Sequence, residues 1–506
     1  MRMTSSNLNE IWMKAYEVNI KDVSGKAEDE ETIGTYGGLT PLDLLDGTQH
    51  PSGIPMGTTE DERLLMDMGE AHNIVVGSTG SGKSLRVLIP MVLSLAGSEE
   101  NAIVHDPKGE IFAKTSGALE AAGYKIHVLD FRRAQNSERW NPFEVAFNMY
   151  QKGCNTMDMY LVDKSYEVLR NFSSILCPVM ESGDDFYWQS CSQNGVFGIM
   201  IDLLRRSLCL EDLNLPEVYN RIEEIFGDDG EGFTRPLNPT EIGELEYKML
   251  KPISTNANNT RNCILSYMRN YILPLTLSST MDRLLSTSDF GFEEFLDGKT
   301  IVYIITPDET DTFDPIVSAF ISTAYMYLVD ASYDHNGKLP YRTNFIIDEF
   351  ASLPVIPGIA KMLNACRSRN IRMTLVVQSM AQLSKYGSKA DDIKGNCNNW
   401  IFLGSKDYST LEEISSLAGK DKNGNERFTV YDLQTLKKSR GEMLTCREGE
   451  VFERSHLGLY SDYIDINSLP KPPEIKMKGT TLEDIERMES LYDSEIDESA
   501  NLQTLF

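Results

Sequence analysis

Seven short apolar runs, rich in β-branched and aromatic residues, recur along the chain. They are NIVVG from Asn73, AIVHD from Ala102, KIHVLD from Lys125, TIVYIIT from Thr300, FIIDE from Phe345, RMTLVVQ from Arg372 and WIFLG from Trp400. Several are apolar at almost every position, which is typical of a strand buried on both faces. The pattern therefore predicts a sheet whose central strands are covered on both sides.

Helical periodicity fills many of the intervals between these runs. Examples are SLRVLIPMVLSLAG from Ser84, PIVSAFISTAYMYLVDA from Pro315 and PGIAKMLNACRS from Pro357. Alternation of strands and helices implies right-handed crossovers, and these give a mainly parallel sheet with helices on both faces. The predicted fold class is α/β.

The alternation stops between about residues 151 and 290, where the pattern is helical, as in FYWQSCSQNGVFGIMIDLLRRSL from Phe186. We expect an all-α domain inserted between two strands of the sheet. Its stretch from Glu211 to Glu246 is acidic, with eleven acids against two arginines. The predicted division is an irregular N-terminal segment (1–60), the first part of the α/β domain (61–150), the all-α domain (151–290), the second part of the α/β domain (291–470) and an acidic C-terminal tail (471–506).

Composition places the chain among ordinary globular proteins. It has 506 residues, of which 41% are hydrophobic and 25% charged, enough for two or three domains. The 8 cysteines are scattered without a CxxC pair, which favours a reduced, intracellular protein without structural zinc. No stretch reaches the roughly 18 apolar residues of a membrane span, so we expect a soluble chain that is not exported.

The formal net charge of -28 argues against a protein coated for nucleic acid, because lysine and arginine drive phosphate binding. One region departs from this balance. Between Lys361 and Lys406, eight basic residues face two acids. A solvated face explains such a run as well as DNA contact does, and the region is our best candidate for DNA contact.

The segment GSTGSGKS fits the phosphate-binding pattern G-x-x-x-x-G-K-[ST] at every position, between a predicted strand and a predicted helix. Its residues, the candidate nucleotide-binding set, are Gly77, Ser78, Thr79, Gly80, Ser81, Gly82, Lys83 and Ser84. Glycines let backbone N–H groups converge on phosphates at a helix N-terminus. Lys83 would reach the β- and γ-phosphates, and the Ser84 hydroxyl would ligate Mg²⁺. The α/β domain is therefore the predicted nucleotide-binding domain.

FIIDE supplies the second half of this site. In an enzyme with such a loop, an acid at the carboxyl end of a neighbouring strand holds the Mg²⁺ shell, and we assign Asp348 to that role. Glu349 would polarise the attacking water as general base. After the second strand, Asp106 and Glu110 of VHDPKGEI would lie near the same edge of the sheet, although a plain strand-to-helix turn explains them equally well.

Arg367 and Gln378 complete the candidate set. If Pro357 to Ser368 is helical, Arg367 lies about 15 to 20 Å from Asp348, too far to serve its own γ-phosphate easily. It suits an arginine finger for a neighbour's nucleotide in a ring, or a helix C-terminal cation. The strand RMTLVVQ returns Gln378 to the phosphate edge, where its amide would sense the γ-phosphate or simply face solvent.

An ordered set of motifs accompanies the phosphate loop. It comprises DPKGE (Asp106 to Glu110), WNPF (Trp140 to Phe143), DFYW (Asp185 to Trp188), FIIDEF (Phe345 to Phe350), the CRSRNI run, VVQS (Val376 to Ser379) and KYG (Lys385 to Gly387). This set, over about residues 70 to 420, resembles the TraG/TraD-type coupling ATPases of conjugation and type IV secretion.

The resemblance implies a RecA-like P-loop NTPase domain that carries an all-α domain and assembles as a homohexamer. It implies an ATPase using ATP and Mg²⁺, located in the cytoplasm at the inner face of the bacterial membrane, that feeds relaxase-bound single-stranded DNA into the secretion channel. It assigns Lys83, Ser84, Asp348 and Glu349 to the ATPase site, Gln378 to the sensor and Arg367 to the intersubunit arginine. The all-α domain would meet relaxase or relaxosome proteins, and its acidic stretch suits a basic partner.

The front of the chain departs from the pattern, because members of this family usually carry N-terminal transmembrane helices. We expect that the span was removed or that a separate membrane subunit supplies it. Two other readings stay open. One is another DNA-translocating ring ATPase; the other is a nucleotide-gated adaptor that recruits substrates and hydrolyses little.

Overall fold

The computed structural model describes residues 36–39, 49–58, 64–180, 183, 185–227, 237, 239–307, 309–464 and 469–473. Its centre is a nine-stranded sheet in the order β12-β11-β10-β4-β9-β8-β5-β7-β6. The strands are β4 (Asn73–Val76), β5 (Asn101–His105), β6 (Lys125–Asp130), β7 (Thr300–Ile305), β8 (Thr343–Ile347), β9 (Ile371–Val377), β10 (Asn399–Phe402), β11 (Glu442–Cys446) and β12 (Glu453–His456). All pairs from β10 to β6 are parallel, and β11 and β12 add an antiparallel edge. The predicted fold class and all seven predicted strands are confirmed.

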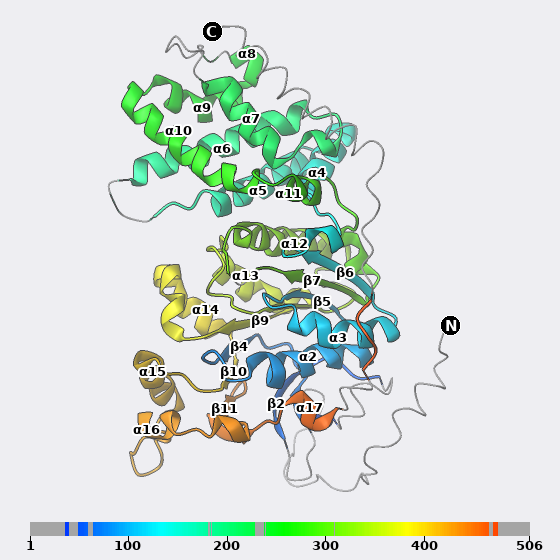
Figure 1. The fold of residues 1–506 in the computed structure, drawn as a ribbon, viewed down its shortest axis with the longest axis vertical. Helices are drawn as coiled ribbons and strands as arrows, with labels where there is room; N and C mark the ends of the chain where they lie inside the picture. The colour runs from blue at the N-terminus through cyan, green and yellow to red at the C-terminus, as the bar shows by residue number, and fades with distance from the viewer. Residues whose placement is uncertain are drawn as a thin grey trace, which may run out of the picture.

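Helices cover both faces of the sheet, with α12 and α13 on one side and α2 and α3 on the other (Figure 1). Every residue of β5, β7, β8 and β9 is buried, which explains why these runs are apolar throughout. Alternate residues enter different cores: Ile103 and Phe345 belong to the core that continues into the helical region, whereas Ala102 and Ile346 belong to the core under α2 and α3. The site-bearing strands are thus clamped between two apolar layers.

The helices around the sheet are close to those predicted. They are η1 (Lys83–Leu88, a π-helical turn), α2 (Ile89–Leu93), η2 (Ser94–Gly97), α3 (Glu110–Ala121), α12 (Asp314–Asp334), α13 (Ile359–Cys366), η7 (Arg367–Arg369), η8 (Met380–Lys389), α14 (Ala390–Asn396), α15 (Tyr408–Ala418), α16 (Val430–Gln434), η9 (Lys438–Arg440) and α17 (Tyr460–Tyr463). The helix predicted from Ser84 is broken into π, α and 3₁₀ turns, with Pro90 in the first turn of α2.

Between β6 and β7 the described residues hold helices and no strand. These are α4 (Glu144–Thr156), α5 (Met159–Leu176), α6 (Phe186–Arg206), α7 (Leu215–Phe226), α8 (Pro239–Ile242), α9 (Glu244–Thr255), α10 (Asn258–Ile272) and α11 (Ser279–Ser286), with short turns η3 (Ala134–Asn136), η4 (Leu210–Asp212), η5 (Leu273–Leu275) and η6 (Phe292–Leu296). They form the upper part of the molecule in Figure 1. The boundaries at residues 151 and 290 stay a prediction.

The WNPF motif joins this helical region to the sheet. The Trp140 N–H donates to the Leu284 carbonyl at 2.9 Å, so the segments entering and leaving the region lie side by side. The Asn141 side chain donates to the Ser286 carbonyl at 2.8 Å, and Arg139 pairs with Asp289 at 2.8 Å. Because these contacts are polar and mostly to backbone, they fix the register of the two segments as well as their proximity.

The prediction of an irregular segment over residues 1–60 is wrong for its described part. β1 (Tyr36–Leu39) and β2 (Ile54–Thr58) pair with β3 (Leu64–Asp67) in a three-stranded antiparallel sheet. The strands are short, and the YGGL and IPMGT sequences carry the glycine and proline that normally punctuate strands, with an irregular register between Pro55 and Gly57. Of the predicted acidic tail, only residues 471–473 lie inside the described part.

Arg372 fastens this N-terminal part to the sheet. Only 1% of its surface is exposed, and its guanidinium donates to the Asn344 side chain at 2.8 Å and the Ser52 hydroxyl at 2.7 Å. Glu100 lies 3.8 Å from it and supplies the opposite charge. Burial lowers the pKa of Arg372 to about 10, so it stays charged at neutral pH.

We expect Arg372→Met to lower the free energy of unfolding by about 2 to 3 kcal/mol, because the buried oxygens of Asn344 and Ser52 would lose their charged donor, while Glu100 would keep Arg342 at 3.4 Å. Urea unfolding monitored by tryptophan fluorescence measures the change. The matched control is Lys361→Met, at an exposed position on α13, which should change stability by less than about 0.5 kcal/mol. A similar small change for both variants would contradict a fastening role for Arg372.

Candidate functional site at the carboxyl edge of the sheet

The phosphate loop, residues Gly77 to Ser84, leaves the end of β4 and enters η1. It is tied to both neighbouring strands, because the Gly77 N–H donates to the Val377 carbonyl and the Ser78 N–H to the Gly404 carbonyl, each at 3.0 Å. Gly80 and Gly82 have φ angles of 75° and 88°, a left-handed conformation that glycine adopts without strain. The sequence motif thus has the backbone that its glycines predict.

Two side chains of the loop are poised for an anion. The Lys83 ammonium donates to the Gly77 carbonyl at 2.8 Å and lies 3.8 Å from the Glu349 carboxylate, with 7% of the residue exposed. The buried Ser81 hydroxyl has no hydrogen-bond partner. A buried hydroxyl without a partner is costly, and a phosphate oxygen would supply one. The loop residues therefore fit a nucleotide phosphate.

The two acids of FIIDE follow β8 directly. Asp348 is 8% exposed, and its carboxylate accepts the Glu349 N–H at 2.9 Å. Burial, reinforced by Glu349, raises the pKa of Asp348 to about 6, while Lys83 and Lys108 act in the opposite direction. Glu349 has a φ of 51°, a left-handed value that is uncommon for a residue with a side chain and tends to cluster at functional sites.

Asp106, at the end of β5, lies beside Asp348. Burial raises its pKa to about 7, and the charge of Asp348 adds to the rise. Its carboxylate accepts the Phe112 N–H at 2.8 Å, and the neighbouring His105 ring donates to the Asp348 carbonyl at 2.7 Å. Of the two candidates in VHDPKGEI, the structure brings Asp106 to the acids and leaves Glu110 exposed in the first turn of α3.

This donor set suits Mg²⁺ better than a metal held by protein alone. Within the described ranges no group of three or more His, Cys, Asp or Glu residues is arranged to hold a metal ion. Mg²⁺ needs few protein ligands, because it keeps several waters and takes the rest of its oxygens from phosphates. The Ser84 hydroxyl and the Asp348 carboxylate, hard oxygen donors at the loop and at the neighbouring acid, are compatible with that requirement.

Gln378 bridges the two halves of the site. Its side-chain amide donates to the Glu349 carboxylate at 2.9 Å, and the Thr79 hydroxyl donates to its carbonyl oxygen at 3.3 Å. β9, which ends just before it, lies between β4 and β8 in the sheet. The topology thus places Gln378 between the phosphate loop and the acids. Its role as a sensor of the γ-phosphate stays a prediction.

Arg367 lies just before the start of β9, at the amino ends of the parallel strands and therefore opposite the phosphate loop. The seven residues of β9 span about 20 Å, so Arg367 does not meet its own phosphate loop. Its side chain is 41% exposed and forms a two-pronged pair with Glu448, at 2.9 and 3.0 Å. It is therefore accessible, but it has a partner within the chain. Its intersubunit role stays a prediction.

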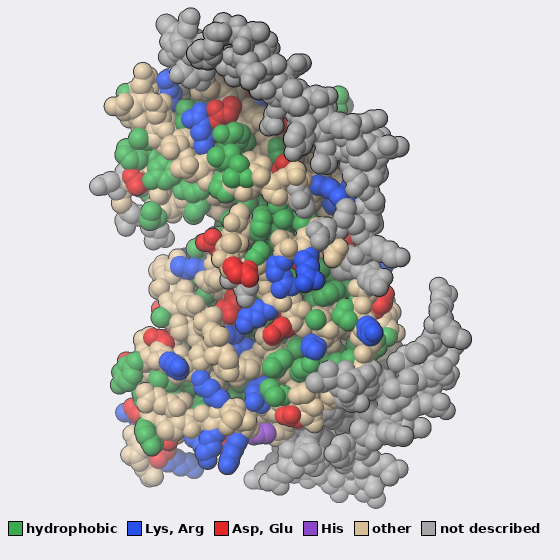
Figure 2. All heavy atoms as spheres, viewed as in Figure 1, with side chains coloured by type: hydrophobic (Ala, Val, Ile, Leu, Met, Phe, Trp, Pro, Cys, Tyr) green, Lys and Arg blue, Asp and Glu red, His purple; other side chains and the backbone are tan. Residues whose placement is uncertain are grey.

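The basic region from Lys361 to Lys406 is not one cationic face. Arg372 is buried, Lys394 lies 2.7 Å from Glu413, and Lys389 lies 3.4 Å from Asp392. On the face drawn in Figure 2, lysine and arginine side chains are scattered among acidic ones. DNA contact by this region stays a prediction, with fewer free cations than the sequence count implies.

The KYG motif packs against Phe350, the residue that follows the two acids. Tyr386 stacks on Phe350 with ring centroids 5.5 Å apart and planes 5° from parallel. Lys385 donates to the Leu353 carbonyl, and burial lowers its pKa to about 8. Gly387 has a φ of 55° and a ψ of -132°, a conformation essentially restricted to glycine.

Sequence reasoning missed Lys438 and Arg86. The Lys438 ammonium donates to the Ser78 hydroxyl at 3.0 Å from a position 360 residues further along the chain. Arg86, which sequence patterns read as part of a helix, sends its guanidinium to the carbonyls of Leu457 and Lys438. No spacing rule points to either residue, because the contacts arise only when β11 and β12 fold back beside β10.

The sheet order and the phosphate loop define a RecA-like P-loop nucleotide-binding fold. The family model described as "Type IV secretory system Conjugative DNA transfer" matches residues 1–170 and 238–444, well over half of the chain. The chain belongs to this family of type IV coupling proteins, and the resemblance inferred from its motifs is confirmed.

Curated relatives agree. The chain is 23% identical over 414 residues to the conjugal transfer protein TraG of Agrobacterium fabrum, covering 78% of this chain and 55% of that protein. It is 21% identical over 444 residues to the protein VirD4 of the same organism, covering 84% of this chain and 61% of that protein. The chain thus spans little more than half the length of these relatives.

Solved structures support the fold. The bacterial conjugative coupling protein TrwBdeltaN70, in a trigonal form with sulphate, matches with a TM-score of 0.59 at 16% identity, covering 88% of this chain and 97% of that one. The plasmid coupling protein TrwB in complex with the non-hydrolysable ATP analogue ADPNP matches with a TM-score of 0.57 at 15% identity and the same coverage. No helix among the described residues has the length and apolarity needed to cross a membrane.

Removing one of the two buried acids should change how stability depends on pH. An acid whose pKa is raised by folding binds its proton more tightly in the folded chain than in the unfolded one. The raised pKa values of Asp106 and Asp348, about 7 and about 6, therefore cost stability progressively as the pH rises from about 4 through about 7. We expect Asp106→Asn to reduce this loss by at least about 1 kcal/mol, measured by urea unfolding in EDTA across that range.

Glu110→Gln is the matched control for Asp106→Asn, because Glu110 is exposed on the same motif. It should leave the pH dependence as in the unmodified chain. Equal pH profiles for all three proteins would show that Asp106 ionises at its ordinary pKa and that the two acids are not coupled.

Proposed function

We propose that this protein is an ATP-hydrolysing coupling protein that recruits relaxase-bound single-stranded DNA, protein substrates or both, and drives them into a type IV secretion channel during conjugative transfer. One observation carries the proposal. The phosphate loop, the acids Asp348 and Glu349, and Gln378 converge at the carboxyl ends of the adjacent strands β4, β8 and β9. This is where a RecA-like sheet binds and hydrolyses nucleotide.

In the proposed reaction, Gly77 to Ser84 wrap the phosphates of ATP with backbone N–H groups, and Lys83 exchanges the Gly77 carbonyl for a phosphate oxygen. Mg²⁺, when bound through Ser84 and Asp348, would neutralise the charge that develops on the phosphates. Glu349 accepts a proton from the attacking water. Gln378 holds the Glu349 carboxylate through a 2.9 Å hydrogen bond, so the orientation of the base depends on it.

Support for ATP and Mg²⁺ comes from the fit of the loop and from TrwB, whose structures include complexes with ADPNP and with ADP and Mg²⁺. Support for DNA, relaxase proteins and channel components as partners comes from the family and from relatives named for conjugal transfer. We place the protein on the cytoplasmic side of the membrane at the secretion apparatus, as a ring, with Arg367 completing the neighbouring site.

A second candidate is a nucleotide-gated adaptor with little turnover. The pair between Arg367 and Glu448 favours it, because an arginine held by its own chain is withheld from a neighbour. The two candidates differ in whether hydrolysis rises when chains assemble, so ATPase rate per chain against protein concentration, with and without single-stranded DNA, separates them. A rate that climbs with concentration and DNA supports the translocating ring.

Glu349→Gln should bind ATP as the unmodified protein does and lose about 10²- to 10⁴-fold in turnover, because it removes the general base and keeps the shape. Lys83→Ala should lose binding as well, because it removes the cation of the phosphate loop. Binding is measured with a fluorescent ATP analogue and turnover by phosphate release. Unchanged hydrolysis by the Glu349→Gln variant would sink the assignment of the base.

Arg367→Ala should keep ATP binding and lower turnover, by up to about 10³-fold if it acts as a finger. Mixing it with Asp348→Ala should restore part of the activity, because hybrid interfaces then contain one intact site. Glu448→Ala is the matched control: it breaks the same ion pair but leaves the arginine, so turnover should not fall. Equal losses for both single variants, without rescue at any mixing ratio, would make the pair structural.

A further inference from the structure

A lysine outside the nucleotide motifs is built against the phosphate loop. Lys438 opens η9, in the segment between α16 and β11, and its ammonium donates to the Ser78 hydroxyl at 3.0 Å. Gly404, after β10, makes room for it: a Cβ there would lie 2.6 Å from the Lys438 side chain. The Gly404 carbonyl also accepts the Ser78 N–H at 3.0 Å. Ser78 is thus held from two sides.

Arg86 ties the same segment to the helix that follows the loop. Its guanidinium donates to the Leu457 carbonyl at 2.5 Å and to the Lys438 carbonyl at 3.1 Å, and the residue is 7% exposed. Glycine is required at position 441, because φ is 76° there and a Cβ would clash with the Leu457 carbonyl oxygen and lie 2.7 Å from the Arg86 guanidinium. Lys438 and Arg86 therefore link the phosphate loop and the helical turn after it to the segments that flank the hairpin of β11 and β12.

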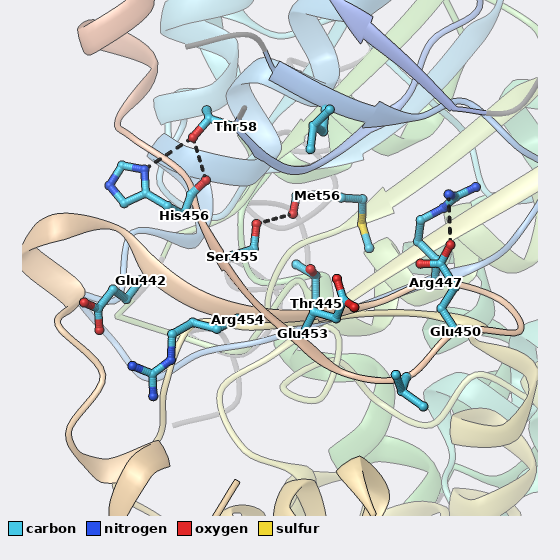
Figure 3. Close-up of a pocket in the computed structure, with 12 residues that line it drawn as sticks. Met56, Thr58, Glu442, Thr445, Arg447, Glu450, Glu453, Arg454, Ser455 and His456 are labelled. Atoms are coloured by element: carbon cyan, nitrogen blue, oxygen red, sulfur yellow. Dashed lines mark hydrogen bonds and ion pairs between the residues drawn. The ribbon is translucent and has the colours of Figure 1, made fainter. Parts of the chain in front are cut away.

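The hairpin itself rests on the N-terminal sheet. Figure 3 shows the two in contact, with the Ser455 hydroxyl donating to the Met56 carbonyl and Thr58 donating to the His456 carbonyl, at 2.8 and 2.9 Å. Arg447 adds an ion pair with Asp67 at 3.1 Å. A hollow of about 510 Å³ remains between them, lined by Met56, Thr58 and Leu65 of the N-terminal sheet and by charged side chains of the hairpin and its connection. The hairpin that follows Lys438 is therefore held in place by the N-terminal sheet.

We propose that Lys438, together with Arg86, is a positioning residue of the phosphate loop, so that nucleotide affinity depends on the hairpin of β11 and β12. The inference rests on the proposed function, because it assumes that the loop binds ATP. Lys438 acts through Ser78: it holds the second residue of the loop against β10, which leaves the backbone N–H groups of Thr79 to Ser84 aligned for phosphate before nucleotide arrives. Prealignment of this kind raises affinity by lowering the ordering cost of binding.

The charge of Lys438 suits this position. Partial burial and the nearby Lys406 both lower the pKa of Lys438, so the ammonium is held half-buried beside like charge. A polyphosphate in the loop brings negative charge to the same place and relieves that cost. A neutral side chain of equal length would keep the packing and lose both the hydrogen bond and the charge.

The test compares Lys438→Met with Lys437→Met, an exposed neighbour, and with Lys438→Arg. We expect Lys438→Met to weaken ATP affinity about tenfold, the worth of one hydrogen bond to a charged group, while turnover at saturating ATP changes less than about twofold. Lys437→Met should match the unmodified protein, and Lys438→Arg should recover most of the affinity. Ser78→Ala should weaken affinity as Lys438→Met does, without further loss in the double variant.

Hydrogen–deuterium exchange of the peptide covering residues 77–84, in protein without nucleotide, separates this inference from the proposed function. Faster exchange in Lys438→Met and not in Lys437→Met is the expected result. Unchanged exchange, or faster exchange with unchanged ATP affinity, overturns the positioning role. If the unmodified protein binds no ATP, the proposed function fails, and the exchange result still decides whether Lys438 holds the loop.

Discussion

The hydrogen bond from the Gly77 N–H to the Val377 carbonyl joins the two strands on which the candidate site depends. It continues the parallel pairing of β4 and β9, which runs from Asn73 and Thr374 to Val76 and Val377, into the first residue of the phosphate loop. Because β9 also pairs with β8, the loop, Gln378 and the acids are held at one height along the sheet. Every contact between Thr79, Gln378 and Glu349 follows from this register.

Polar side chains lie at both ends of these parallel strands, but their surroundings differ. Residues at the carboxyl edge are charged or polar and carry raised pKa values or an unpaired hydroxyl, as Asp106, Asp348 and Ser81 do. Residues at the amino edge are equally polar: Arg372 is satisfied by Asn344 and Ser52, whereas the buried Thr343 hydroxyl has no hydrogen-bond partner. Neither polarity nor a missing partner thus marks function by itself; the candidate site is distinguished by the convergence of the phosphate loop with Glu349 and Gln378.

Sequence reasoning succeeded where a pattern is local. The seven apolar strands are continuous runs, and the loop is a spacing of glycines, so both are read from neighbours in the chain. It failed where an element is stabilised only by distant partners. β2 contains proline and glycine and is held partly by Ser455 and His456. Lys438 contacts Ser78 although the two residues lie 360 positions apart. Neither β2 nor this contact therefore produces a periodic pattern in the sequence.

The three arginines of NACRSRNIR illustrate how a single charged run divides in three dimensions. Arg372 is buried and donates to Ser52 of the N-terminal segment. Arg369 lies over the Tyr333 ring at 5.9 Å, and Arg367 is partly exposed and pairs with Glu448. The run divides because it crosses three elements, from the end of α13 through η7 into β9. Arg367 and Arg369 lie in the short turn η7, whereas Arg372 lies in the strand β9. Arg367, with 41% of its side chain exposed, keeps the accessibility that contact with another chain requires, whereas the buried Arg372 does not.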